Sequence, residues 1–260
     1  YGICFLGTLA YIISYNGMIR PVFNPNIIKQ ISRLGVYTQM ANIAQFLNYR
    51  LTYFFIKSFW LSPGQSTAPL GVYGAMNKLV DGNWLISKSL SLVQYSVLSN
   101  REEETYAQKL TLAFVKFSLI ITALITAALI VLPGSFYQWL LGGESFSQIP
   151  RLILIFSPGI LAMSVNNILA HYFAAKGLQK INAMVSLLGL VITVVAGLLL
   201  IPAYGLPGAA YTSSIAHTAS TIMIIALFLS RTKLHLSAFL ISKSDITLAK
   251  NLVWSFRKNK

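Results

Sequence analysis

Long stretches of apolar residues without any charge dominate the second half of the chain. Residues 152–175, 181–201 and 206–230 contain no Lys, Arg, Asp or Glu. Each stretch is long enough to cross about 30 Å of hydrocarbon as an α-helix. Hydropathy and the placing of Pro and Gly predict seven helices in all, at 1–18, 35–60, 70–98, 109–132, 149–175, 179–201 and 207–231. Because lipid offers an open backbone no hydrogen-bond partners, we expect an all-α fold, a polytopic membrane helix bundle.

The loops between these helices alternate in basic content. Lys and Arg occur in residues 19–34, 99–109 and 176–180 and in the tail, whereas residues 61–69, 133–148 and 202–206 contain neither. Basic loops stay on the cytoplasmic side of a membrane. The pattern therefore predicts that the chain begins outside and that its C-terminus is cytoplasmic.

Composition supports a membrane protein and excludes an ordinary soluble domain. The 260 residues are 55% hydrophobic and only 10% charged, and 20 Lys and Arg against 6 Asp and Glu give a net charge of +14. Basic loops at a membrane account for that charge, so we expect no nucleic-acid partner. One cysteine, Cys4, excludes an intrachain disulfide and a cysteine-based zinc site. Since the chain opens on Tyr1 within an apolar stretch, we expect a fragment that lacks its N-terminal part.

Polar residues recur on one face of the predicted helix 35–60. At 100° per residue, one stripe holds Gln39, Asn42, Arg50, Tyr53 and Lys57. A charge at the bilayer centre costs at least about 2.5 kcal/mol, so such a stripe should face water or another helix rather than lipid.

A second polar stripe follows on the predicted helix 70–98, where Asn77, Asp81, Trp84 and Lys88 share a face and Lys78 flanks it. Lys78 and Asp81 are three residues apart and can pair on the helix surface, which is the structural alternative to a role in binding. Together the two helices keep an excess of positive charge. Because Arg binds phosphate oxygens as a fork and Lys as a point charge, we predict a cationic lumen that binds an anionic ligand.

Two histidines lie within the last predicted helices. His171 with its neighbouring asparagines, and His217, are candidates for a proton relay, although such groups more often hydrogen-bond between helices. The acidic run 102–104 is expected to be solvated surface. No metalloprotease, serine-hydrolase or phosphate-loop motif occurs, so we expect no enzyme, no cofactor and no metal site.

Three motifs resemble the polysaccharide-transporter branch of the multidrug/oligosaccharidyl-lipid/polysaccharide exporter superfamily. The most specific is the hairpin at residues 200–210, LIPAYGLPGAA, in which Pro202 is expected to end one helix and Gly205 to permit the reversal. The second is FAAKG at 173–177, and the third is LGVYGAMNKL at 70–79.

The resemblance implies two six-helix lobes around a central cavity, with alternating access. Residues 1–18 would then be the last transmembrane helix of a truncated N-terminal bundle, 19–34 a cytoplasmic inter-lobe linker, 35–231 the C-terminal six-helix lobe, and 232–260 a basic cytoplasmic tail. The implied function is a flippase that carries undecaprenyl-pyrophosphate-linked oligosaccharide repeat units across the bacterial inner membrane for O-antigen or capsule synthesis. Its partners would be the lipid-linked oligosaccharide, membrane lipids, and a polysaccharide polymerase and glycosyltransferases.

Other functions stay open at this point. A cation-coupled multidrug or metabolite exporter of the same superfamily would share the fold but would usually have a less cationic binding lobe. A membrane enzyme such as a repeat-unit polymerase is disfavoured because no predicted outer loop is large.

Overall fold

The computed structural model describes residues 24–60, 67–100 and 103–239, together with residues 7, 8, 11 and 14. All of the regular structure in these residues is helical, which confirms the predicted all-α fold. The elements are α2 (Pro25–Phe55), η1 (Ile56–Trp60), α3 (Ala68–Ser99), α4 (Glu104–Val131), α5 (Gly134–Leu141), η2 (Glu144–Gln148), α6 (Ile149–Ala175), α7 (Gln179–Tyr204), α8 (Leu206–Thr232) and η3 (Leu236–Phe239). The chain divides into two compact units, Tyr1–Val36 and Tyr37–Lys260, and the second unit holds the packing and the site residues described below.

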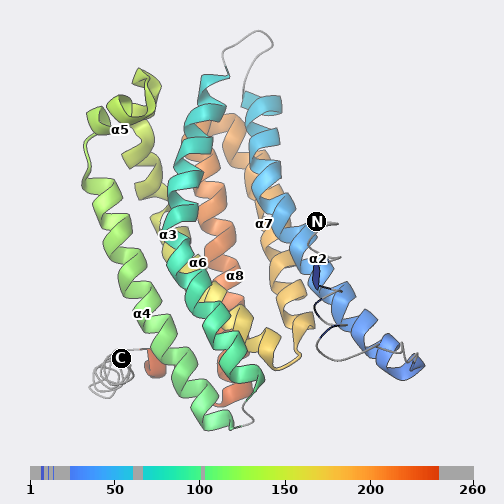
Figure 1. Ribbon diagram of the computed structural model, residues 1–260. Coiled ribbons are helices and arrows are strands. Elements are labelled where there is room, and N and C mark those ends of the chain that lie inside the picture. Colours follow the sequence, from blue (N-terminus) through green and yellow to red (C-terminus); the bar gives the residue numbers. More distant parts are fainter. Residues whose placement is uncertain are drawn as a thin grey trace. The chain divides into compact units, whose positions relative to one another are not determined.

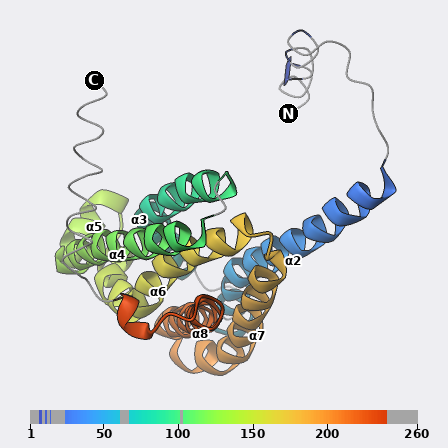
Figure 2. The ribbon, with the colours of Figure 1, turned by 90° about the horizontal axis from the view of Figure 1, so that it is seen from below.

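Helix α6 is the centre of the second unit. It packs against α3, α4 and α8, and α7 packs against α8 on the far side (Figure 1). The end-on view in Figure 2 shows α3 and α4 on one flank and α7 and α8 on the other. Of the apolar window in Glu144–Ala175, 67% is buried inside the protein, against 22% for the window in α4. An apolar helix that is buried on most of its surface lies inside a bundle, and α4 keeps a wide apolar surface for lipid.

Two apolar clusters build the interior. One surrounds Trp84, Phe156 and Tyr137, and the other surrounds Phe228, Tyr172 and Phe173. Rings of Trp84 and Phe156 meet edge to face, as do those of Tyr172 and Phe228. Each cluster therefore ties α6 to its neighbours, one cluster towards each half of the helix.

The turn between α7 and α8 follows the predicted hairpin with one correction. Gly205 makes the reversal at φ 60°, a conformation that side chains disfavour, and Pro207 lies in the first turn of α8. Pro202 does not end α7, which continues to Tyr204. Pro202 removes one amide donor from α7, and the Gly205 amide still closes the helix by donating to the Ile201 carbonyl at 2.8 Å.

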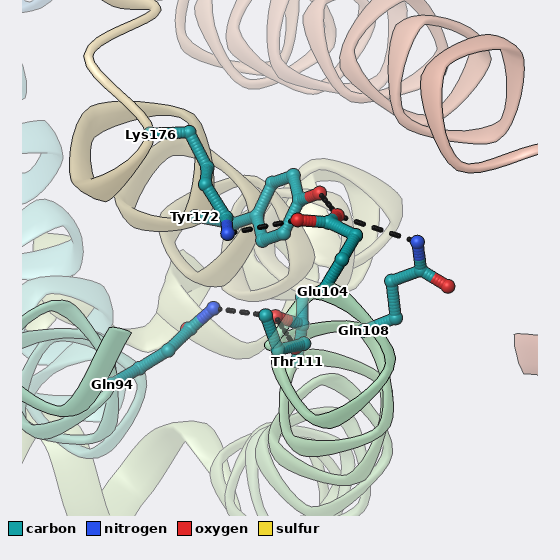
Figure 3. A network of polar contacts seen from close by, with 7 residues as sticks. Gln94, Glu104, Gln108, Thr111, Tyr172 and Lys176 are labelled. Atoms are coloured by element: carbon teal, nitrogen blue, oxygen red, sulfur yellow. Dashed lines mark hydrogen bonds and ion pairs between the residues drawn. The ribbon is translucent and has the colours of Figure 1, made fainter. Parts of the chain in front are cut away.

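Polar contacts join the start of α4 to the end of α6. The Glu104 carboxylate accepts hydrogen bonds from the Tyr172 hydroxyl and the Gln108 amide and pairs with Lys176, while Gln94 of α3 donates to Thr111 nearby (Figure 3). Glu103 and Glu104 are exposed, as expected for the acidic run, and the Glu104 carboxylate makes these contacts in addition. This carboxylate meets the partner helix because α4 begins at this residue.

Several helix boundaries differ from those expected. Helix α2 begins at Pro25, ten residues before the predicted start at 35, because residues 25–34 contain polar side chains but no helix breaker after Pro25. The short elements α5 and η2 occupy a segment that was expected to be loop. Most of the predicted helix 1–18 and most of the tail lie outside the described residues; residues 7, 8, 11 and 14, which are described, are helical.

Among the residues that the structure describes, four segments are long and apolar enough to cross a membrane: Glu104–Val131, Glu144–Ala175, Gln179–Tyr204 and Leu206–Thr232. Helices α2 and α3 have comparable lengths, 31 and 32 residues, but are absent from this set. These two helices carry the polar stripes. The same polar residues lower the hydropathy of the helices and form the predicted binding site.

Candidate functional site

A groove between α2 and α3 contains the predicted charges. We name it the charged groove; its volume is about 340 Å³ and it is lined by Asn42, Gln45, Phe46, Tyr49, Asp81 and Lys88. Asp81 and Lys88 are half-buried on one face of α3, as the stripe predicted. Tyr49 and Phe46 form the apolar part of the opposite wall.

Two further cations belong to the surroundings of the groove. The Arg50 guanidinium lies 5.4 Å from the ring centre of Phe46, so it extends along α2 towards the groove. Lys78 is exposed on α3. Within the described part of the chain, no ion pair within 4.0 Å joins Lys78 to Asp81. The cations Arg50, Lys78 and Lys88 outnumber the carboxylate of Asp81, so the net charge around the groove is positive.

The remaining predicted residues have different places. The Asn77 amide donates to the Tyr53 hydroxyl at 3.1 Å, which links α3 to α2. Gln39 is exposed and lies outside the lining of the charged groove. Asn42 lines it.

Trp84 requires a correction. Its side chain is only 1% exposed, and its Nε1 donates to the Ile160 carbonyl at 2.9 Å. The indole is thus a core residue between α3 and α6 rather than a platform for a ligand. Helical periodicity placed Trp84 on the polar face of α3, but at this position along the helix that face packs against α6.

A second space lies among α2, α3, α6, α7 and α8. We name it the amide cavity; its volume is about 360 Å³. Amide side chains line it from several helices, and no Lys, Arg, Asp or Glu is part of its lining. These amides are Asn42, Gln45, Asn48, Asn166, Asn167, Gln179 and Asn182.

Both candidate relay histidines line the amide cavity. His171 Nδ1 lies 2.8 Å from the carbonyl oxygen of Asn167 in its own helix, and its ring meets Tyr95 edge to face. His217 is buried against the rings of Trp84 and Phe156. The structure brings the two rings to one cavity, and a relay between them stays a prediction. In the described part of the chain no cluster of His, Cys, Asp and Glu could hold a metal ion.

The stripe analysis missed most of the amide cavity. Gln45, Asn48 and Asn182 were not singled out, because no charge marks them and each looks like an isolated polar residue in an apolar run. A signal was present nonetheless. Polar residues three or four apart, namely Thr38, Asn42 and Gln45 on α2 and Asn182 and Ser186 on α7, would have placed polar atoms on one face of each helix.

The structure is thus a membrane-type helix bundle with a charged groove on α2 and α3 and a polar cavity among five helices. Solved structures share this fold. A MOP superfamily transporter from Pyrococcus furiosus Vc1, described as having a binding pocket of reverse polarity, matches with TM-score 0.68 at 17% identity, over 84% of this chain and 49% of that one. A MATE protein in complex with MaD3S matches with TM-score 0.70 at 18% identity, over 84% and 50%. The likeness is one of fold, and the chain spans about half the length of these transporters.

The chain belongs to the family of the lipid II flippase MurJ, whose family model matches residues 9–255. The search of curated proteins finds no match. The superfamily predicted from the motifs is confirmed, as is the fold of one transporter half. The polysaccharide-transporter branch stays a prediction.

Proposed function

We propose that this chain forms the second lobe of a flippase for undecaprenyl-pyrophosphate-linked saccharides, with residues 1–18 as the last helix of the first lobe. The observation that carries the proposal is the match of the lipid II flippase family to residues 9–255. In such a protein the two lobes would alternate in opening the cavity to each leaflet. The basic tail and the basic loops would face the cytoplasm of a bacterium, and the lobe would lie in the inner membrane.

The charged groove supports a pyrophosphate as the recognised group. Lys88 is half-buried beside Asn42 and Gln45, which can donate hydrogen bonds to phosphate oxygens. Arg50 extends along the same wall and offers a forked donor. Because Lys88 is half-buried, it attracts an anion more strongly than a fully exposed cation does, and the exposed Arg50 adds a second positive charge nearby.

Two cargoes fit this chemistry. The sequence motifs favour an O-antigen or capsule repeat unit, for which a polymerase and glycosyltransferases would be partners, and the family favours lipid II. Both cargoes carry the saccharide on a polyprenyl pyrophosphate, so the groove does not distinguish between them. A transport assay that offers labelled lipid II and a labelled lipid-linked repeat unit in parallel would distinguish them.

The test uses this chain together with its preceding lobe, reconstituted in proteoliposomes. Arg50→Ala should abolish the transfer of labelled undecaprenyl-pyrophosphate-linked saccharide between leaflets while the protein level stays normal. Arg151→Ala is the matched control, since Arg151 is exposed at the start of α6 and lines neither space. Transfer that persists in Arg50→Ala would remove Arg50 from the mechanism, and wild-type protein that transfers neither cargo would refute the flippase.

The alternative function is export of drugs or metabolites coupled to a cation. The fold of a multidrug resistance MATE family transporter keeps this function open, because one fold serves several cargoes. An exporter would accumulate or expel a cationic dye in the same vesicles. The excess of positive charge on α2 and α3 disfavours a cationic cargo.

A further inference from the structure

The amide cavity and the charged groove share two wall residues. Asn42 and Gln45 of α2 line both spaces, so the neutral cavity begins where the charged groove ends. A ligand with an anionic part and an adjoining uncharged polar part could occupy both spaces at once. A saccharide attached to a pyrophosphate has this composition.

The chemistry of the amide cavity favours hydroxyl and acetamido groups. Amides supply a donor and an acceptor at each side chain, and neutral sugars present both in return. The rings of Tyr95 and His171 stand at the same cavity and meet edge to face, which leaves ring surface for the apolar face of a sugar. With no Lys, Arg, Asp or Glu in the lining, a charged group would find no opposite charge there.

Two buried amide oxygens in the lining accept no hydrogen bond from the described residues: Asn48 Oδ1 and Asn182 Oδ1. The Asn182 amide nitrogen donates to the Ala170 carbonyl at 2.8 Å, which fixes its oxygen as the unused acceptor. Buried polar atoms in native proteins generally have partners. Both oxygens are covered by neighbouring atoms, so they show that the cavity wall is polar and incompletely paired, and the accessible amides of the lining are the groups that a ligand would contact.

We propose that the amide cavity binds the neutral saccharide of the lipid-linked substrate while the charged groove binds its pyrophosphate. This inference rests on the proposed function and adds the division of the ligand between two adjoining spaces. At about 360 Å³, the cavity lies near the lower end of small-molecule sites, which suits the sugars next to the pyrophosphate rather than a whole repeat unit.

The test compares two probes on the two-lobed protein in nanodiscs: undecaprenyl pyrophosphate, and undecaprenyl pyrophosphate that carries one N-acetylglucosamine. Asn48→Leu replaces an amide by an apolar group of similar size. It should weaken binding of the sugar-bearing probe by about tenfold or more and leave the sugar-free probe unchanged. Gln148→Leu is the control, because Gln148 bonds only locally, to the Ser145 carbonyl, outside both spaces.

Asn166→Leu is the second variant if Asn48→Leu does not fold, since Asn166 lines the amide cavity but not the charged groove. Equal loss for both probes, or no loss for either, would overturn the saccharide site and leave the flippase standing. Wild-type protein that binds neither probe would overturn the flippase and this inference together. Free N-acetylglucosamine is then added as a competitor of the sugar-bearing probe. Competition would show that the cavity binds the sugar alone and would support the saccharide site directly, whereas a site that needs the lipid-linked form would show none.

Discussion

Glu104 and Lys176 join the first turn of α4 to the turn after α6, with 2.8 Å between Oε2 and Nζ. Lys176 lies in the basic turn 176–180, and Glu104 follows the basic segment that begins after α3. The contact shows that these two basic segments meet at one end of the bundle. A shared end agrees with the prediction from charge that both segments lie on one side of the membrane, and which side that is stays a prediction.

Reversal of this ion pair should be a mild and recoverable change. The Glu104 side chain is 50% exposed and that of Lys176 21%, so solvent screens the pair and its contribution is about 0.5 kcal/mol. Glu104→Lys should lower the thermal unfolding midpoint in detergent slightly, and adding Lys176→Glu should restore most of the loss. Tyr172 would still lack its carboxylate acceptor in the double variant, so recovery should be incomplete. No recovery at all would show that the charges do not interact.

Substitution of Gly159 should destabilise the bundle more than any surface change. A Cβ at this position would lie 2.6 Å from the Ser214 Cα, and the backbone of α8 cannot move aside cheaply. Gly159→Ala should therefore cost about 1–3 kcal/mol through overpacking. Gly71→Ala on α3, where nothing lies within 4 Å, is the control and should be neutral or slightly stabilising. Thermal unfolding of both variants decides between overpacking and an intrinsic effect of alanine.

The fold was largely predictable because apolar length carries most of the information in a membrane protein. The predicted helix at 149–175 has the observed bounds of α6, and the hairpin glycine Gly205 was identified correctly. Hydropathy did not predict the helix boundary where a helix extends beyond its apolar stretch. Pro25 begins α2 in a polar segment, and α7 continues past Pro202 to Tyr204.

The candidate site was less predictable, for a reason visible in Trp84. Helical angles place residues on a face, but they do not tell which neighbour covers that face at a given depth. Asp81 and Lys88 were predicted to share a face and do line one groove, whereas Trp84 on the same face is covered by α6. The amides of Asn48 and Asn182 were missed because the polar spacing within one helix does not show that five helices enclose a common cavity.

Trp84 offers a test of packing against binding. Trp84→Phe keeps an aromatic ring but removes the donor to the Ile160 carbonyl, and it should cost about 1–3 kcal/mol of stability. Trp84→Ala should cost about 3–5 kcal/mol and reduce the amount of folded protein in the membrane. Fluorescence-detected size exclusion after heating measures both. If the Trp84→Phe protein is as stable as the wild type but no longer transfers substrate, the indole acts in substrate binding and not in packing.

Lys88 and Asp81 should have opposite effects on an anionic ligand, because they line the same groove with opposite charge. Lys88→Met removes a cation from a half-buried wall and should weaken binding of undecaprenyl pyrophosphate by about tenfold. Asp81→Asn removes the repelling carboxylate and should tighten binding by a few-fold, and both effects should shrink as salt is raised. Lys109→Met, exposed on α4, controls for the loss of any one positive charge. Titration of the two-lobed protein with the labelled lipid gives the three affinities. If Asp81→Asn weakens binding as Lys88→Met does, Asp81 orients the lysine rather than repelling the ligand, and the groove binds through the pair.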